Sequence, residues 1–416
     1  MSLVSNNYTQ ESNGSGFATE DLIEALTSQL QKMPLVSKED VDDLELKLAY
    51  NGSPYSPSDH IDDPSDIRLD LDTNSLIHAI GRENSIKVLM RCPRYSYAYV
   101  ASLNGSFRDL IKSGEIYEVR SKNQVIEHWV YFSCHMLKWE AFDPVNKKWM
   151  NLPMINGDAC FEYSDKESMA VGTELLVLGK DVSGQAVYKY NLLTNSWTEE
   201  RTMNKPRCLF GSASLGKIAI FAGGVDGNGK VVDTVESYDG ETGAWETLPS
   251  LLKPRKMSSG VFMDGRFYVI GGCGGSDMKQ LSCGEEYDPI AKKWKVIPNM
   301  SPGGGVGSMA PPLLAVVDNE LYVADCVAME VKKYDKKLKV WESIGELPKR
   351  ADHMDGWGIA FRGCGDRVII VGGPRGYGEP YVEIFSWVPK AGPLKWTMIG
   401  RKKSDNFVYN CAIMGC

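Results

Sequence analysis

Residues 208–249 read CLFGSASLGKIAIFAGGVDGNGKVVDTVESYDGETGAWETLP, and this stretch decides the fold. Its strand-forming residues fall into four short runs, at 208–215, 218–222, 234–239 and 244–249. Gly216-Lys217 is a two-residue break of the kind that joins the strands of a hairpin, and Gly223-Gly224 ends the second run. The stretch therefore predicts four strands, joined by turns, in one antiparallel sheet.

A tryptophan recurs along the chain at a nearly constant spacing. The six positions are Trp149, Trp197, Trp245, Trp294, Trp341 and Trp396, at intervals of 48, 48, 49, 47 and 55 residues. Five of them follow an aromatic residue by seven positions, and these partners are Phe142, Tyr190, Tyr238, Tyr287 and Tyr334. Such a period indicates a modular array, and a four-stranded sheet repeated around a ring is a blade of a β-propeller.

The ends of the array predict the number of blades. The first unit begins at Ile126 and has only three strand signals, at 129–134, 139–143 and 148–152. The apolar run 407–414 has no blade of its own. If that run supplies the missing strand, the ring closes with six blades and leaves no exposed sheet edge at its seam. We therefore predict a mainly β fold, a six-bladed propeller.

The repeated residues have structural roles in this interpretation. Each tryptophan and its aromatic partner should fill the gap between neighbouring blades, where burial of a large ring contributes ~2–3 kcal/mol. The double glycine permits a positive φ and a close approach of two backbones. The tryptophans are therefore assigned to structure rather than to chemistry.

Residues 1–72 differ from the remainder in charge and composition. They contain 15 acidic and 4 basic residues, so they account for the net charge of −8, and they are rich in Ser, Asn and Asp. We expect a disordered acidic tail, which offers no attraction for nucleic acid. Residues 19–26, with Leu30, have apolar side chains at helical spacing. They are either a helix that binds a partner or a transient helix.

Residues 73–120 are predicted to be helical. Ile86, Leu89 and Met90 have helical spacing, and Pro93 should end that helix because proline has no N–H to donate. Two further short helices are expected over 97–103 and 107–111, the second ending at Gly114. Three helices of this size form a poor core alone, so the unit needs a partner or a neighbouring domain.

Several classes of site and location are not indicated by the sequence. No run of 18 apolar residues and no signal-peptide pattern is present, so we expect no membrane association and a location in the nucleus or cytoplasm. The ten cysteines show no C-x-x-C pair and are expected to be reduced thiols. The histidines lack metal-ligand spacing, so we predict no metal, no cofactor and no catalytic residue.

Two glycine-rich segments suggest a phosphate site only at first sight. Residues 211–217 nearly match a P-loop, but Ile218 replaces the hydroxyl residue that should follow the lysine, and a strand rather than a helix comes next. Residues 301–307 lie where one blade passes to the next. We interpret the first segment as a hairpin turn and the second as a loop.

The repeated pattern resembles the kelch repeat. Its marks are the double glycine, then Tyr-Asp, then a tryptophan seven residues after the tyrosine, and they extend over 124–416. The match is strongest in the third and fourth units. Other units depart from it, with Gly179-Lys180 and Ala324-Asp325 in place of the two glycines. The resemblance implies a propeller that binds other proteins.

Residues 74–120 resemble the F-box that precedes kelch repeats in plant proteins. The resemblance is carried by Leu76-Ile77, by SIKVLMRCPR at 85–94, by ASLN at 101–104 and by SFR at 106–108, with Ile77 at the usual proline position. It implies a non-catalytic substrate receptor of an SCF-type ubiquitin ligase, whose F-box binds a Skp-type adaptor and, through it, a cullin. The residues implied in adaptor binding are Leu76, Ile77, Ile86, Leu89, Met90, Cys92, Pro93 and Leu103.

Arginines at equivalent places are the candidates for binding an unidentified protein substrate. They either precede a first strand or follow the last double glycine, and they are Arg207, Arg255, Arg350, Arg375 and Arg401. Guanidinium groups gathered on one face suit carboxylates or phosphates. Alternatively, each arginine satisfies carbonyls or acids within its own blade. Trp357 in the same zone is either an anchor for the substrate or part of the core.

Two other functions stay open at this point. The chain could be a kelch scaffold that works outside a ligase, a hypothesis prompted by Ile77. It could also be a propeller enzyme, although the sequence pairs no nucleophile with a base.

Overall fold

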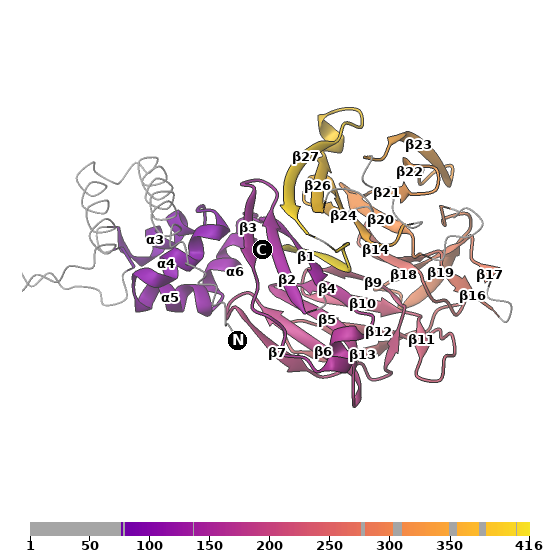
Figure 1. Cartoon of the computed structure of the whole chain (residues 1–416), viewed down its shortest axis with the longest axis horizontal. Coiled ribbons are helices and arrows are strands. Elements are labelled where there is room, and N and C mark those ends of the chain that lie inside the picture. Colours follow the sequence, from indigo (N-terminus) through magenta and orange to yellow (C-terminus); the bar gives the residue numbers. More distant parts are fainter. Residues whose placement is uncertain are drawn as a thin grey trace, which may run out of the picture. The chain divides into compact units, whose positions relative to one another are not determined.

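The computed structural model describes residues 76–77, 80–135, 137–275, 279–302, 310–348, 356–373, 380–404 and 406–416 (Figure 1). It separates into two units. One contains the chain up to Glu127 together with Cys416, and the other is the β unit His128–Gly415. The predicted acidic tail, with its helix at 19–26, lies outside the described residues, and the boundaries at 72 and 124 stay predictions.

The first unit is helical. Its elements are α3 (Gly81–Leu89), the 3-10 turn η1 (Arg94–Ser96), α4 (Tyr97–Leu103), α5 (Gly105–Lys112) and α6 (Glu115–Lys122). Asn104 caps α5, because its side-chain oxygen accepts a hydrogen bond from the Phe107 N–H at 3.0 Å. Gly114 has a φ of 81°, which permits the sharp turn into α6. The sequence analysis did not predict α6.

The second unit consists of six four-stranded antiparallel sheets, which confirms the predicted six-bladed propeller. Blade 1 consists of β28 (Asn410–Gly415), β1 (His128–His135), β2 (Lys138–Asp143) and β3 (Lys148–Asn151). Blade 2 consists of β4 (Glu167–Val171), β5 (Glu174–Asp181), β6 (Gly184–Asn191) and β7 (Ser196–Glu200). Blade 3 consists of β9 (Gly211–Leu215), β10 (Ile218–Ala222), β12 (Val235–Asp239) and β13 (Ala244–Leu248). Blade 4 consists of β14 (Ser259–Met263), β15 (Arg266–Ile270), β18 (Gly284–Asp288) and β19 (Lys293–Ile297). Blade 5 consists of β20 (Leu313–Val317), β21 (Glu320–Asp325), β22 (Glu330–Asp335) and β23 (Val340–Glu346). Blade 6 consists of β24 (Ile359–Cys364), β25 (Arg367–Gly372), β26 (Tyr381–Trp387) and β27 (Thr397–Lys403).

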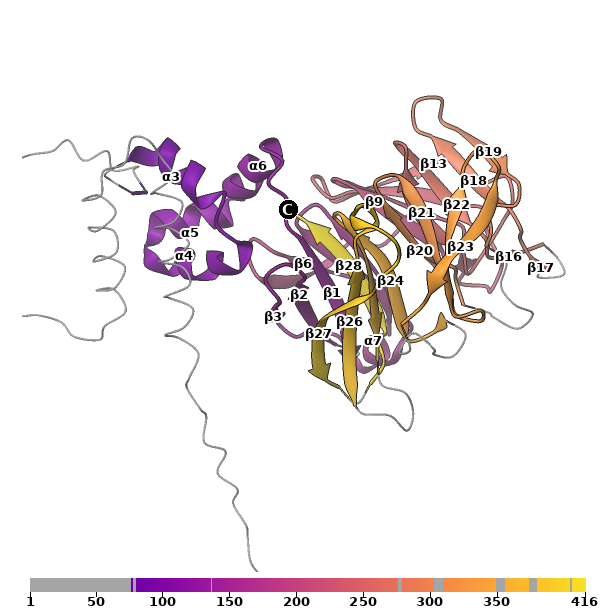
Figure 2. The same cartoon turned by 90° about the horizontal axis from the view of Figure 1, so that it is seen from above.

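The end of the chain closes the ring. β28 pairs with β1 from Trp129 opposite Met414 to Ser133 opposite Asn410, so the last strand completes the blade that the first strands begin (Figure 2). The innermost strands then contact one another in the cyclic order β4, β9, β14, β20, β24 and β28. No described blade therefore has an inner edge without neighbours.

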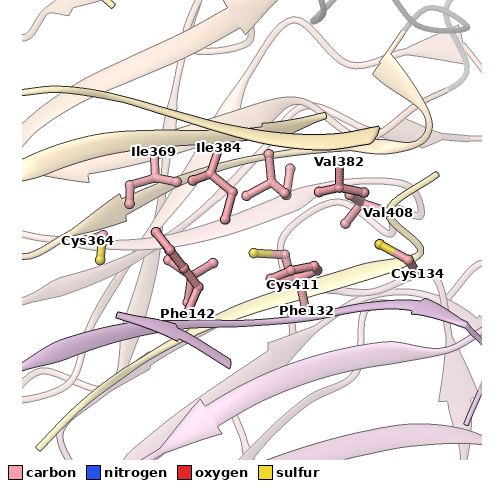
Figure 3. Packing of buried hydrophobic residues seen from close by; sticks show 12 residues of the cluster. Phe132, Cys134, Phe142, Cys364, Ile369, Val382, Ile384, Val408 and Cys411 are labelled. Atoms are coloured by element: carbon pink, nitrogen blue, oxygen red, sulfur yellow. The ribbon is translucent and has the colours of Figure 1, made fainter. Parts of the chain in front are cut away.

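The hydrophobic core lies between the blades. Each of five buried clusters combines residues of two neighbouring blades. Figure 3 shows the one between blades 6 and 1, where Ile369 and Ile384 lie opposite Phe142 and Cys411. A blade is thus stabilised by burial against both neighbours rather than by a core of its own.

Each repeated tryptophan contacts the preceding blade. The half-buried indole stands opposite its aromatic partner on the neighbouring strand; for example, Tyr238 and Trp245 have ring centroids 5.1 Å apart. Five indole N–H groups also donate to a carbonyl at the end of the blade before. These bonds run from Trp197 to Pro153 (2.7 Å), Trp245 to Arg201 (3.0 Å), Trp294 to Pro249 (2.7 Å), Trp341 to Met300 (3.2 Å) and Trp396 to Glu346 (2.9 Å).

The residue after each aromatic partner forms the turn to the outermost strand. Its side-chain oxygen accepts N–H groups two and three residues ahead, as Asp288 does from Ile290 (2.9 Å) and Ala291 (3.0 Å). Asp143, Asn191, Asp239 and Asp335 do the same in their blades. The Tyr-Asp pair of the repeat is therefore one packing residue followed by one turn residue.

One strand was predicted to be longer than it is. The run 208–215 was expected to be a single strand, but Leu209 has a φ of 59°, which breaks it. The Leu209 N–H donates to the Glu167 carboxylate at 2.8 Å instead of a ladder partner. The residues before the break form β8 (Arg207–Cys208), which pairs with β11 (Val225–Asp226). A similar ribbon of β16 (Cys273–Gly274) and β17 (Lys279–Gln280) follows in blade 4.

The two roles of the double glycine, a positive φ and a close approach of two backbones, can be tested separately. Gly223 has a φ of +71°, and a Cβ there would collide with the Arg255 carbonyl oxygen. Gly216 has a φ of +60° in open space, whereas Gly227 has open space without a positive φ. We expect G227A to leave the free energy of unfolding within about 1 kcal/mol of the parent. G216A should lose about 1–2 kcal/mol, and G223A a further 1–3 kcal/mol, in urea titrations. Equal losses for G216A and G223A would contradict the backbone contact.

Candidate functional site

One face of the propeller carries the longer connecting segments. Because the strands of each blade are antiparallel, the connections between blades emerge on the same side as the loops between second and third strands. We call this side the connection face. The five arginine candidates were predicted to lie at such positions, so their exposure on the connection face decides whether they can bind a substrate.

Arg207 is an internal residue of blade 3. Its side chain is 1% exposed and forms an ion pair with Glu236, which is fully buried. The guanidinium also donates to the carbonyls of Gly223 (2.8 Å) and Phe221 (2.9 Å). Burial lowers the pKa of Arg207, and the Glu236 carboxylate opposes that shift. The charge is therefore compensated entirely within the blade.

Arg255 repeats this arrangement in blade 4. It is fully buried, pairs with Glu285 at 2.6 Å and donates to the carbonyls of Gly271 (2.9 Å) and Cys283 (3.3 Å). Glu285 in turn accepts the N–H of Leu252 at 2.7 Å. The substrate-binding prediction is corrected for Arg207 and Arg255, because neither guanidinium reaches the surface. Each satisfies carbonyls and an acid of its own blade, which was the stated alternative.

Of the other three arginine candidates, Arg401 alone lies in the part of the chain that the structure describes. Arg401 lies on β27 with its side chain 40% exposed, stacks at 3.9 Å from the ring centre of Tyr381 and pairs with Glu383 at 3.2 Å. Arg350 and Arg375 lie outside the described residues. The structure therefore does not bring the five arginines together as one exposed ring.

A small pocket opens on the connection face between blades 4, 5 and 6. Its volume is about 80 Å³, and its wall includes Met257, Cys273, Leu281, Pro312, Val323, Ala324, Asp325, Val327 and Gly356. Pockets for small molecules are several times larger, so this one suits a single side chain. Val327 on its wall is 54% exposed, and Trp357, next in sequence to Gly356, is 42% exposed. Trp357 is thus not part of the core.

The pocket lies where the repeat departs from its pattern. In blade 5, Ala324-Asp325 occupies the place of the double glycine, and both residues line the pocket. In blade 3, a Cβ on Gly223 would meet the segment that leads into the next blade. At the corresponding place in blade 5, Ala324 and Asp325 both carry a Cβ. Asp325 is itself satisfied, since it accepts the Ala328 N–H at 2.9 Å and pairs with Lys332 at 2.7 Å.

The residues implied in adaptor binding divide into two groups. Leu76, Ile77, Leu89, Met90 and Cys92 are buried, between 0% and 9% exposed. Ile86, Pro93 and Leu103 are partly exposed. Only the second group offers side-chain surface to a partner in the described structure, whereas the first group builds the core of the helical unit.

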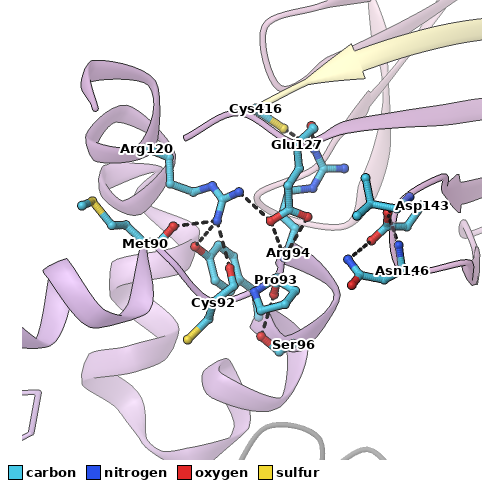
Figure 4. Close-up of polar contacts among 12 residues, drawn as sticks. Met90, Cys92, Pro93, Arg94, Ser96, Arg120, Glu127, Asp143, Asn146 and Cys416 are labelled. Carbon is cyan, nitrogen blue, oxygen red and sulfur yellow. Dashed lines mark hydrogen bonds and ion pairs between the residues drawn. The ribbon is translucent and has the colours of Figure 1, made fainter. Parts of the chain in front are cut away.

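A buried arginine missed by the sequence analysis organises the helical unit (Figure 4). Arg120 of α6 is fully buried and donates to the carbonyls of Met90 (2.8 Å) and Cys92 (3.0 Å). It also forms an ion pair with Glu127 at 2.6 Å. A signal was present in the sequence, because Arg120 follows the apolar Ile116 by four positions and so shares its buried helix face.

The described residues show little that resembles catalytic chemistry. Among them, no group of three or more His, Cys, Asp or Glu side chains is arranged to hold a metal ion. Burial raises the pKa of the Cys92 thiol to about 12 and that of the Cys411 thiol to about 11. Both thiols are therefore protonated at neutral pH and poor nucleophiles. No helix in this part of the chain is long and apolar enough to cross a membrane.

The buried pair Arg255–Glu285 should be essential for stability. R255M leaves Glu285 charged and buried, so the free energy of unfolding should fall by about 3–5 kcal/mol. R266M is a matched control in the same blade, since Arg266 is 42% exposed and pairs with Glu286 at 2.5 Å. Its loss should stay below about 1 kcal/mol. Chemical denaturation of the full chain measures both, and similar losses would contradict the internal role of Arg255.

Comparison with known proteins gives consistent matches along the chain. The Kelch motif matches residues 206–252 and 254–301, which contain blades 3 and 4 with their double glycines. The Arabidopsis thaliana F-box/kelch-repeat protein SKIP11 is 56% identical over 359 residues, covering 83% of this chain and 76% of the relative. Two more from the same plant, At1g26930 and At1g74510, are 52% and 47% identical, each covering 83% of this chain and 84% and 78% of the relative. This chain therefore belongs to the F-box/kelch-repeat proteins.

Proposed function

We propose that the protein is a substrate-recognition subunit of an SCF-type E3 ubiquitin ligase. Its helical unit binds a Skp-type adaptor and, through it, a cullin, while the propeller holds a protein substrate. The observation that carries the proposal is the presence of the F-box-like helical unit and a closed kelch propeller in one chain. Ubiquitin transfer is the work of other subunits, so the protein itself is a receptor and not an enzyme.

The departure at Ile77 is compatible with this role. The Ile77 N–H donates to the Ser85 hydroxyl at 3.0 Å, a bond that a proline could not make. Ser85 in turn donates to the Gly81 carbonyl at 2.6 Å, at the first turn of α3. Isoleucine therefore ties the start of the unit to α3 by a hydrogen bond. A scaffold working outside a ligase is the second candidate, favoured only by this substitution.

The substrate would bind on the connection face at the pocket. Val327 and Trp357 combine exposed apolar surface with a recess for one side chain, which is the usual anatomy of an anchor site. A location in the nucleus or cytoplasm belongs to the proposal. It is supported by the ten cysteines, none of which forms a disulfide bond in the structure.

The first test is adaptor binding by the full chain. I86D and L103D each place a charge on partly exposed apolar surface, so each should weaken binding to a purified Skp-type adaptor at least tenfold, or about 1.4 kcal/mol. K112A changes an exposed residue of α5 and is the matched control. Leu89 is unsuitable because it is 1% exposed and its loss would unfold the unit. If the parent chain fails to bind the adaptor, the ligase role is wrong.

The second test concerns the substrate site. A chain carrying L103D should accumulate its substrate, because capture continues without transfer. In that background, V327D and W357A should abolish co-purification of the same set of proteins. I290D is the control, since Ile290 is 96% exposed in a turn on the face opposite the pocket. If all three variants retain the set, the substrate binds elsewhere.

A further inference from the structure

The backbone between α3 and η1 is held by side chains in addition to its own hydrogen bonds. α3 ends at Leu89, where the Arg91 and Cys92 N–H groups donate to the Val88 and Leu89 carbonyls at 3.0 Å each, and Pro93 prevents the helix from continuing. The Tyr97 hydroxyl donates to the Leu89 carbonyl at 3.0 Å. Arg120 donates to the carbonyls of Met90 and Cys92, which follow the helix. A cation at a helix C-terminus is also favoured by the helix dipole.

Glu127 is the carboxylate that makes the burial of Arg120 possible. A fully buried guanidinium requires an opposite charge within hydrogen-bond reach. Glu127 provides it at 2.6 Å, and its two carboxylate oxygens also accept the Arg94 N–H at 3.0 and 3.2 Å. One carboxylate thus joins α6 to the first residue of η1, so it fixes both ends of the segment 90–94.

The position of Glu127 is set by the last residue of the sequence. The Glu127 N–H donates to the Cys416 carbonyl at 3.0 Å, and the Cys416 N–H donates to the Glu127 carbonyl at 3.2 Å. The Arg94 guanidinium donates to that same Glu127 carbonyl at 3.3 Å and lies against the Cys416 sulfur. Cys416 therefore belongs to the helical unit although nearly 300 residues separate it from Glu127 in sequence.

We propose that Arg120 and Glu127 are positioning residues for adaptor binding, held in register by Cys416. They act on the segment 90–94, which contains Met90, Cys92 and Pro93 of the implied adaptor-binding set. The functional F-box consequently extends beyond residue 120, to Glu127 and to the C-terminal residue. This inference rests on the proposed function, but the placement of the segment can be measured independently of adaptor binding.

The test compares E127A, E127Q and E118Q in the full chain. E127A removes the carboxylate that accepts from Arg120 Nη2 and from the Arg94 N–H, whereas the glutamine oxygen can still accept from both. E118Q removes an exposed pair with Lys122 on the same helix and serves as the control. Two quantities are measured: the affinity for a purified Skp-type adaptor, and amide hydrogen exchange in the segment 90–94 and in α5.

E127A should weaken adaptor binding at least tenfold and accelerate exchange of the Cys92 and Arg94 amides while α5 keeps its protection. E127Q should fall between E127A and the parent, and E118Q should match the parent. A chain ending at Gly415 should show the same selective loosening, because Glu127 then loses its strand partner.

Three results would overturn the inference. The first is an unchanged adaptor affinity in E127A, and the second is unchanged amide exchange in the segment 90–94 of that variant. The third is a loss of protection in α5 as well as in the segment 90–94 of E127A, which would assign Glu127 a merely structural role. Failure of the parent chain to bind the adaptor would instead refute the proposed function, and the exchange data would still decide where the segment is held.

Discussion

The pairing of β28 with β1 is the interaction on which the propeller depends. Each of the five hydrophobic clusters described in the β unit is shared by two neighbouring blades, so blades 1 and 6 can bury the faces that meet at the seam only when the ring is complete. The cluster between blades 6 and 1 draws on residues from Val130 to Cys411 and forms only when the two ends of the array meet. Pairing across that sequence separation is entropically costly, and the closed ring offsets the cost by removing the last exposed edge.

Local regularities made most of this fold predictable from the sequence. The tryptophan period, the alternation within each strand and the glycine turns are all short-range signals, and the spare run at 407–414 then implied closure. The errors came from tertiary contacts. Leu209 adopts a positive φ because its N–H is needed by Glu167 of the neighbouring blade, and no local pattern shows that. The helix α6 was missed because its buried face includes the charged Arg120.

The candidate site was less predictable because burial is not a local property. An arginine in a polar loop is normally assigned to the surface. Arg120, Arg207 and Arg255 are instead enclosed, since a guanidinium carries five donors in a rigid fork and can satisfy several carbonyls and one carboxylate at once. In each case some of the carbonyls lie just after a helix or strand: in the segment that follows α3, or in the double glycine after a second strand. The sequence shows the arginine but not the carbonyls that surround it.

The departures from the repeat are more informative about function than the repeat itself. Blades 3 and 4 are closely packed: the first glycine of each pair lies against the next connection, the second lies against the segment that enters its own blade, and each blade contains a buried ion pair. Blade 5 lacks the double glycine, and Ala324 and Asp325, which replace it, line the pocket on the connection face. A scaffold held together by its regular units can tolerate one irregular unit, and such a unit is where a partner can be recognised without loss of the fold.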